Sequence, residues 1–190
     1  MQLELVEIIE RVGVTCVMVP HDQEEAMTMA ERIAIMHLGC IEQIGSPVDI
    51  YETPISRQVC EFIGSVNLFD GEVVDDAEDH AVIACPQLER NIYVGHGVST
   101  SVEDKRVTYA LRPEKLIVTT EQPTCEHNWS SGKVHDIAYL GGHSVFHVEL
   151  PSGMIVQSFV ANAERRGTRP TWGDNVFVCW EDDSGVVLRA

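Results

Sequence analysis

The stretch VTCVMVPHDQEEA, residues 14–26, decides the fold of the N-terminal part of the chain. A mostly apolar run ends at Pro20 and His21, and Asp22 then opens a segment with a helical pattern. A short, nearly unbroken apolar run is typical of a strand that is covered on both faces. We therefore predict a buried strand over residues 14–19. His21 would lie at its carboxyl end, where open α/β sheets bind their ligands.

The residues on either side of this run follow the period of an amphipathic helix. Upstream, the apolar residues that share one helix face are Leu5, Ile8, Ile9 and Val12. Gly13 follows them and predicts a helix end, because glycine readily adopts the left-handed conformation. Downstream, Asp22 and Glu25 have the spacing of a capping box. The next predicted buried helix stripe consists of Ala26, Met29, Ala30 and Ile33.

Residues 32–64 continue with shorter elements. Two short strands are predicted over residues 32–36 and 40–44. Ser46 and Thr53 are each followed by proline, which predicts two helix starts with proline at the first helical position. The apolar stripe of the second of these helices is Ile55, Val59, Phe62 and Ile63, and Gly64 can end it. The whole order predicts the end of an α/β domain.

From Ser65 onward the apolar residues follow a period of two, which is typical of half-buried strands. The predicted strands cover residues 71–74, 80–85, 107–111, 116–118, 133–140, 145–150, 154–160, 176–180 and 186–189, the last two as a hairpin. Many short strands with almost no helix predict a small all-β, OB-like barrel. We therefore predict an α/β fragment over residues 1–65 and a β-domain over residues 66–190.

Composition excludes several classes of protein and site. The chain has 190 residues and a formal net charge of -17, which argues against nucleic-acid binding because that needs clustered lysine and arginine. No apolar stretch approaches the roughly 18 residues of a membrane-spanning helix. The six cysteines contain no C-x-x-C pair and are expected to be mostly buried, reduced thiols. His143 and His147 share a strand face without zinc spacing, so no metal ligands are predicted.

Several separated motifs resemble those of ABC-transporter ATPases and occur in the same order. HDQEEA at residues 21–26 resembles the switch-histidine segment, and residues 39–54 resemble the pattern that follows it. EFIGSVN at residues 61–67 resembles the exit from the ATPase domain. ALRPE and YLGG, at residues 110–114 and 139–142, resemble the TOBE-type (transport-associated OB) β-domain of importer ATPases. The finer resemblance, to putrescine/spermidine importers, rests on residues 11–19 and on TWGD at residues 171–174.

This resemblance implies a fold and a function. Residues 1–65 would be the C-terminal part of a P-loop ATPase domain, and residues 66–190 a TOBE-type regulatory domain. In such ATPases two subunits enclose two ATP molecules, so His21 would be the catalytic and cofactor-binding residue that contacts the γ-phosphate. The implied cofactors are ATP and Mg²⁺, and the implied partners are a second ATPase subunit in a homodimer and the membrane permease subunits. Such a subunit lies in the cytoplasm, on the inner face of the membrane, and energises polyamine import.

The chain departs from the family pattern at two points. It contains no G-x-x-x-x-G-K-[ST] phosphate loop, no LSGGQ signature and no apolar strand that ends in Asp-Glu. We therefore expect a truncated form that neither binds ATP tightly nor hydrolyses it alone. Pro20 stands where threonine or serine is usual, and it removes a backbone N–H beside the histidine. The apolar faces of residues 1–64 are expected to be exposed, with loose packing, self-association or cover from the β-domain.

Two other functions stay open at this point. An OB-like domain could act as a stand-alone ligand-binding or dimerisation module, although the acidic charge disfavours anionic ligands. An unrelated hydrolase could use His21 with the carboxylates of Asp22, Glu24 and Glu25. Helix capping and the favourable interaction of carboxylates with a helix N-terminus explain those three acids more simply.

Four residues of the β-domain also have more than one interpretation. Arg112 and Glu114 could contact a partner, or they could form an ion pair that fixes a turn. Trp172 and Trp180 are predicted to be core or barrel-rim side chains.

Overall fold

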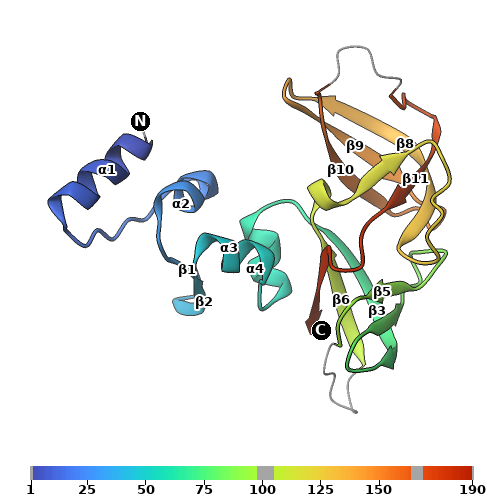
Figure 1. Cartoon of the computed structure of the whole chain (residues 1–190), viewed down its shortest axis with the longest axis horizontal. Coiled ribbons are helices and arrows are strands. Elements are labelled where there is room, and N and C mark those ends of the chain that lie inside the picture. Colours follow the sequence, from blue (N-terminus) through green and yellow to red (C-terminus); the bar gives the residue numbers. More distant parts are fainter. Residues whose placement is uncertain (1, 98–104, 164–168, 190) are drawn as a thin grey trace. The chain divides into compact units, whose positions relative to one another are not determined.

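The computed structural model of the protein describes residues 2–97, 105–163 and 169–189. The chain divides into two compact units, Met1–Gly64 and Ser65–Ala190 (Figure 1). We call the first the N-terminal unit and the second the β-unit. No helix in the described ranges is long and apolar enough to cross a membrane.

The N-terminal unit combines short helices with one hairpin. In chain order its elements are α1 (Gln2–Val12), α2 (Gln23–Met29), β1 (Ile33–His37), β2 (Cys40–Gly45), α3 (Pro47–Glu52) and α4 (Arg57–Ile63). Its small core comes from β1 and the last two helices and consists of Ile33, Ile35, Ile50, Val59 and Ile63. Five aliphatic side chains are a small apolar core, so this unit has little burial to stabilise it.

Local sequence signals account for most helix ends in this unit. Gly13 ends α1 at φ +68°, and its amide donates to the carbonyls of Ile9 and Glu10. α3 begins with a complete capping box, in which the Asp49 amide donates to the Ser46 hydroxyl at 3.2 Å and the Ser46 amide donates to the Asp49 carboxylate at 3.0 Å. These interactions involve residues at most four apart, so the sequence alone can specify them.

Two of the predicted helix boundaries are wrong. Ser56, not Thr53, is the N-cap of α4, because its hydroxyl accepts the Val59 amide. α2 ends at Met29, so Ile33 belongs to β1 and not to the predicted helix stripe. Apolar residues at helical spacing therefore continue across a boundary that the pattern does not mark.

The predicted buried strand over residues 14–19 is also wrong. Residues 14–20 form neither helix nor strand, and Val17 and Val19 are 90% and 87% exposed. A strand needs a neighbour to pair its N–H and C=O groups, and none of the described strands pairs with this segment. α1 likewise has no buried residue. The expectation of exposed apolar faces in this half is therefore confirmed.

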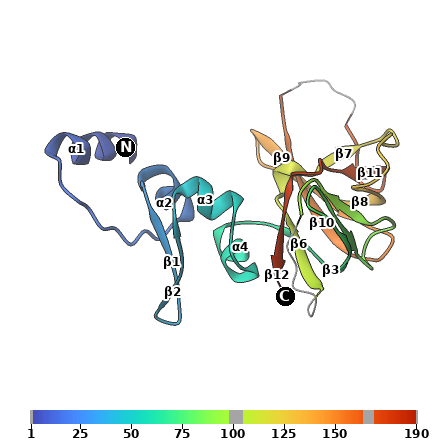
Figure 2. The same cartoon turned by 60° about the horizontal axis from the view of Figure 1, so that its bottom comes forward.

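The β-unit consists of two antiparallel sheets. Its elements are β3 (Asn67–Asp76), β4 (Ala81–Ala84), β5 (Ile92–Val94), β6 (Arg106–Leu111), the 3-10 helix η1 (Pro113–Lys115), β7 (Ile117–Thr119), β8 (Trp129–Tyr139), β9 (His143–Glu149), β10 (Ile155–Ala161), β11 (Asn175–Cys179) and β12 (Gly185–Arg189). One sheet has the strand order β12-β6-β3-β4-β5 and the other β10-β9-β8-β11-β7 (Figure 2). The predicted all-β domain is present.

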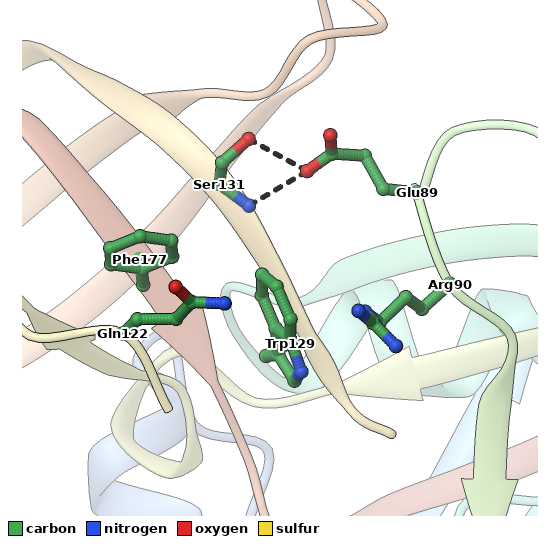
Figure 3. A pocket seen from close by; sticks show the side chains of 6 residues that line it. All are labelled: Glu89, Arg90, Gln122, Trp129, Ser131 and Phe177. Atoms are coloured by element: carbon green, nitrogen blue, oxygen red, sulfur yellow. Dashed lines mark hydrogen bonds between the residues drawn. The ribbon is translucent and has the colours of Figure 1, made fainter. Parts of the chain in front are cut away.

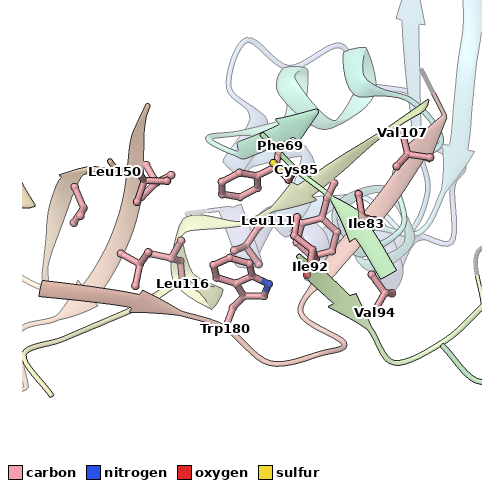
Figure 4. Packing of buried hydrophobic residues seen from close by; sticks show 14 of the residues in the cluster. Phe69, Ile83, Cys85, Ile92, Val94, Val107, Leu111, Leu116, Leu150 and Trp180 are labelled. Carbon is pink, nitrogen blue, oxygen red and sulfur yellow. The ribbon is translucent and has the colours of Figure 1, made fainter. Parts of the chain in front are cut away.

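A single apolar core is shared by the two sheets. Its members on both sheets include Phe69, Val73, Ile83, Ile92, Tyr109 and Leu111 from the first, and Val134, Phe146, Val148, Val156, Val176 and Val178 from the second. Trp180 follows β11 and stacks on Phe69, with ring centroids 5.8 Å apart and an interplanar angle of 15° (Figure 4). The Tyr109 ring lies 6.4 Å from the Trp180 ring. Trp180 is therefore a core residue, as predicted.

The strand pairing differs from the prediction at two places. β5 has only three residues, and the sequence analysis missed it. The predicted hairpin of the last two strands does not form, because β11 pairs with β7 and β8 whereas β12 pairs with β6 in the other sheet. The connection between β11 and β12 therefore carries the chain from one sheet to the other. Periodicity predicts that a segment is a strand, but it does not name the partner.

Half of the cysteines also differ from the prediction. All six are free thiols, and Cys60 and Cys85 are buried as expected. Cys16, Cys40 and Cys125 are exposed, and Cys179 is partly buried. The exposed ones lie in segments whose burial the sequence pattern did not determine.

Gly185 provides a test of the packing of this core. A Cβ atom at Gly185 would lie 2.1 Å from Cζ and 2.4 Å from the hydroxyl oxygen of Tyr109, which is fully buried and cannot move aside. We expect Gly185→Ala to lower the free energy of unfolding of the β-unit by about 1–3 kcal/mol, as overpacking does. All three tryptophans lie in this unit, so denaturant unfolding followed by their fluorescence measures its stability.

Gly142→Ala is the matched control, because a Cβ there meets nothing within 4 Å. We expect it to leave the unfolding midpoint almost unchanged. Equal effects of the two substitutions would contradict the tight contact between Gly185 and Tyr109.

Candidate functional site

His21 lies on the surface, between the exposed segment of residues 14–20 and the start of α2. Asp22 is the N-cap of α2, and its carboxylate accepts the Glu24 amide at 2.9 Å. The cap bond thus goes to Glu24, whereas the predicted capping box paired Asp22 with Glu25. Gln23 donates through its side chain to the carbonyl of Phe62, which ties this helix start to α4. The imidazole is therefore exposed beside an anchored helix start.

The acids near His21 have structural roles that weaken the hydrolase interpretation. The Asp22 carboxylate is occupied by its cap bond. Glu24 and Glu25 lie in the first helical turn, where a negative charge interacts favourably with the unpaired backbone N–H groups. His21 carries hydrogen-bonding nitrogens into solvent, which suits contact with a phosphate oxygen.

A pocket of about 430 Å³ lies on the outer face of the β8–β11 sheet. Its lining residues are Glu89, Arg90, Gln122, Trp129, Ser131 and Phe177 (Figure 3). The Trp129 and Phe177 rings meet edge to face, with centroids 5.8 Å apart. The pocket was not predicted, since no motif of the sequence marks these residues.

The charged groups of this pocket bind the chain itself. The Glu89 carboxylate accepts the Ser131 amide at 3.0 Å and the Ser131 hydroxyl at 2.7 Å (Figure 3). These hydrogen bonds hold the pKa of Glu89 below its ordinary value. The Arg90 guanidinium lies 4.5 Å from the centroid of the Trp129 ring and donates to the carbonyl of Glu126 at 3.2 Å. Both side chains thus join the β4–β5 connection to β8.

Asn128 is a buried polar residue that joins the same two regions. It is 2% exposed and has φ +58°, a conformation that asparagine tolerates better than most residues. Its side-chain oxygen accepts the Tyr93 amide at 2.8 Å, and its side-chain nitrogen donates to the Tyr93 carbonyl and the Asp182 carboxylate, each at 2.9 Å. Its own carbonyl accepts the Trp180 amide at 3.1 Å. One side chain thus connects β5, β8 and the β11–β12 turn.

The ALRPE segment forms the end of β6 and the start of η1. Arg112 is 5% exposed and donates to the carbonyl of Ser65 at 3.2 Å, so it holds the first residue of the β-unit. Pro113 begins η1, and the Lys115 amide donates to the Arg112 carbonyl at 3.0 Å. The ion pair between Arg112 and Glu114 stays a prediction. Arg112 has a structural role in either case.

The TWGD segment is a tight turn on the surface. The Asp174 carboxylate accepts the Thr171 amide at 2.7 Å, and Gly173 has φ +80°. Trp172 is 63% exposed, so it is not a core residue, and its place at the barrel rim stays a prediction. Its indole N–H donates to the Asp136 carboxylate at 3.0 Å, and this bond lowers the pKa of Asp136. The turn holds the tryptophan outward, which a pattern of apolar residues does not reveal.

Three aromatic rings stack on the surface near β4 and β5. Tyr93 lies between His80 and His127, with ring centroids 5.5 Å apart on each side. His80 pairs through Nδ1 with Asp79 at 2.9 Å and through Nε2 with Asp75 at 3.4 Å. The Asp79 carboxylate, and to a lesser degree Asp75, raises the pKa of His80, while desolvation opposes the shift. No group of three or more potential ligands is arranged for a metal in the described part of the chain.

Residues 109–188 match the family model of the TOBE domain. The β-unit therefore contains a TOBE domain. The putrescine transport ATP-binding protein PotG of Escherichia coli (strain K12) is 53% identical over 99% of this chain and 50% of its own length. The spermidine/putrescine import ATP-binding proteins PotA of Trichodesmium erythraeum and Thermotoga maritima are 36% and 31% identical, over 99% and 98% of this chain and 50% and 51% of their own lengths.

These matches confirm the resemblance to the ATP-binding subunits of polyamine importers. The chain spans about half the length of the curated relatives it matches. Among solved structures, the cytoplasmic molybdate-binding protein ModG, with molybdate bound, has a TM-score of 0.52 at 14% identity. That match covers 64% of this chain and 94% of ModG, and it supports the OB-like fold of the β-unit.

Asn128 provides a test of the polar connection between the sheets. Asn128→Ala removes the partners of the Tyr93 amide, the Tyr93 carbonyl and Asp182, and it places alanine at positive φ. We expect it to lower the free energy of unfolding by about 2 kcal/mol or more, from unsatisfied buried groups and backbone strain. Tryptophan fluorescence in denaturant gives the value.

Asn128→Gly separates the two causes, because glycine accepts positive φ but also lacks the amide. We expect Asn128→Gly to be destabilised by less than Asn128→Ala, and still by more than Gly142→Ala. Wild-type stability in Asn128→Gly would contradict the role of the side-chain amide.

The His80 pair predicts a pH dependence for the β-unit. Because its folded pKa is raised, protonated His80 stabilises the fold fully below its ordinary pKa, and this stabilisation is lost as pH rises through the raised value. The groups that face it are Asp75, Asp79 and Tyr93. We expect the thermal midpoint of the wild type, relative to His80→Gln, to fall between about pH 6 and pH 8.

The corresponding control is His37→Gln, on the hairpin of the N-terminal unit. The difference in thermal midpoint between His37→Gln and the wild type, followed through tryptophan fluorescence, should not change over the same pH range. Parallel pH curves for the wild type and His80→Gln would refute the role of the His80 pair.

Proposed function

We propose that this chain is the C-terminal part of the ATP-binding subunit of an ABC transporter that imports polyamines, putrescine in particular. The observation that carries the proposal is the 53% identity to PotG over 99% of the chain. The match runs through both units, so it includes the segment around His21 as well as the TOBE domain. If the chain were a stand-alone ligand-binding or dimerisation module, we would expect only its β-unit to be similar to such relatives.

In this proposal the N-terminal unit is the end of a P-loop ATPase domain. Residues 14–19 are apolar and exposed, and they follow a helix whose residues are not buried. Such a segment is suited to pair with further strands of a parallel sheet and to be covered by helices on both faces. We infer that the predicted strand forms only when that sheet is present, and that His21 then lies at its carboxyl edge.

His21 is the residue to which we assign a part in ATP hydrolysis. A neutral imidazole can accept a hydrogen bond at one nitrogen and donate one at the other, so it can hold a phosphate oxygen or orient water. Pro20 before it has no N–H to offer. The neighbouring Asp22, Glu24 and Glu25 are acidic and would repel a phosphate, so the imidazole is the group of this segment suited to contact one.

These 190 residues do not by themselves fit ATP with Mg²⁺. Phosphates and the metal ion are held by a glycine-rich loop with its lysine and hydroxyl residue, and the sequence contains no such motif. We propose that those groups belong to residues outside these 190, and that this chain alone binds no nucleotide tightly.

The partners follow from the same assignment. We propose a homodimer of ATP-binding subunits, docked to membrane permease subunits on the cytoplasmic face of the membrane. The β-unit would be the regulatory domain of each subunit. The formal net charge of the chain is -17, which argues against nucleic acid as a partner.

ATP turnover tests the proposal when this chain is compared with a form extended upstream through a phosphate loop. We expect turnover in the extended form only. His21→Ala in that form should lower kcat by about a hundredfold or more while ATP binding persists, because the lost contact acts on the reacting phosphate. Amide exchange over residues 14–19 should be slow in the extended form and fast in this chain.

His37→Ala is the control, since His37 is an exposed histidine of the same unit. It should leave kcat unchanged. ATP hydrolysis by the 190-residue chain alone would overturn the assignment, and so would full turnover in the His21→Ala variant.

A further inference from the structure

Gln23 follows His21 and Asp22 directly and connects two helices of the N-terminal unit. It is the first residue of α2, and its side-chain N–H donates to the backbone carbonyl of Phe62, 39 residues further along the chain. Phe62 lies in the last turn of α4, where backbone carbonyls have no partner within the helix. Gln23 thus caps the carboxyl end of α4, while Asp22 caps the start of α2.

The two helices that this hydrogen bond joins are held to different degrees. α2 has no buried residue, and it contributes to the core of the unit through Ala26 and Met27, which are partly buried. α4 has three buried residues, Val59, Cys60 and Ile63. Apolar burial therefore fixes α4 more firmly than α2. A hydrogen bond is directional, so the one between the helices fixes the start of α2 relative to the end of α4.

His21 receives little support from the residues before it. Residues 14–20 form neither helix nor strand, and Pro20 has no N–H to donate. On the other side, the cap bond of Asp22 joins residues only two apart, so it sets the local turn and nothing further away. The bond from Gln23 reaches α4. It therefore sets where the imidazole lies relative to the core of the unit.

We propose that Gln23 is a positioning residue for His21 in ATP hydrolysis, an inference that rests on the proposed function. The side-chain amide of Gln23 is bonded to α4, so it acts through His21 and not on the phosphate. A displacement of about 1 Å is enough to slow a reaction that depends on the alignment of a side chain with the reacting group. Loss of the bond to Phe62 therefore lowers kcat. Binding of ATP depends on the phosphate loop and is retained.

The kinetic test uses the form extended upstream through a phosphate loop. Gln23→Met removes the donor without adding a charge, and Gln23→Glu keeps the shape of the side chain but cannot donate when ionised. We expect each to lower kcat about fivefold to tenfold, with the Kd of ATP unchanged. In the His21→Ala background neither should lower kcat further, because the effects of residues that act as a unit are not additive.

Gln43→Met is the matched control, because Gln43 also donates to a backbone carbonyl of the same unit, that of Thr53, at 3.1 Å. It should leave kcat unchanged. A fall in kcat for Gln23→Glu alone would show charge repulsion and overturn the proposal, and so would a full effect of Gln23→Met in the His21→Ala background. Full turnover in His21→Ala refutes the proposed function, whereas a slow His21→Ala beside a fully active Gln23→Met refutes only the role of Gln23.

Carbonyl NMR tests the bond itself in the 190-residue chain, without nucleotide. Phe62 is the only phenylalanine of the sequence that isoleucine follows, so labelling with carbonyl-¹³C phenylalanine and ¹⁵N isoleucine gives a single cross-peak for its carbonyl. We expect the carbon resonance to move to lower chemical shift in Gln23→Met and Gln23→Glu, and to stay in place in Gln43→Met. A resonance that is unchanged in both Gln23 variants would overturn the proposal, whatever the kinetics.

Discussion

The arrangement of the β-unit depends on the hydrogen bonds that the side-chain amide of Asn128 makes. An apolar core holds two sheets together without fixing how one is placed along the other, because hydrophobic burial is not directional. Hydrogen bonds are directional, and Asn128 takes the place of a strand residue beside Tyr93 by accepting from its amide and donating to its carbonyl. Its third bond, to Asp182, holds the turn through which the chain passes from β11 to β12. The contact between Glu89 and Ser131 repeats the connection a few residues away. Together they determine where the pocket lies.

The N-terminal unit shows the opposite case, in which local interactions are satisfied and long-range ones are not. Its helix ends are specified by caps within a few residues, such as Ser46 with Asp49 and Gly13 with Ile9. Each cap contributes about 1 kcal/mol, which positions a helix but does not bury it. The apolar run of residues 14–19 needs partners on both sides and on both faces, and the described residues provide none. The segment around His21 therefore has the sequence of a buried strand end and the environment of a surface loop.

The same distinction explains how much could be predicted from the sequence. Period-two patterns located most strands of the β-unit, because alternation is a local consequence of one buried face. They also located the point near Ser65 where helical spacing of the apolar residues gives way to a period of two. The partners of β11 could not be predicted, since Asn175–Cys179 pairs with segments 42 to 62 residues earlier in the chain. Asn128 reads in sequence as an ordinary turn residue before a strand, and only its burial reveals its role. No sequence motif marks Glu89 or Trp129. A buried asparagine at positive φ is recognisable in a structure, but the sequence offers only a weak hint through the residue type.

The fold of the β-unit does not determine what it binds. ModG has a similar fold at 14% identity and, by its description, binds molybdate, an anion. In the present chain the net charge is -17, and the charged groups of the pocket in the β-unit are held by Ser131, Trp129 and the backbone of Glu126. A carboxylate and a guanidinium that are already bound within the chain stabilise the junction of two sheets, and a ligand would have to displace those bonds to use them. The charged groups of the pocket thus join the β4–β5 connection to β8, and they are not free to hold an anion. For this reason the likeness of fold to ModG does not by itself place an anion site in this chain.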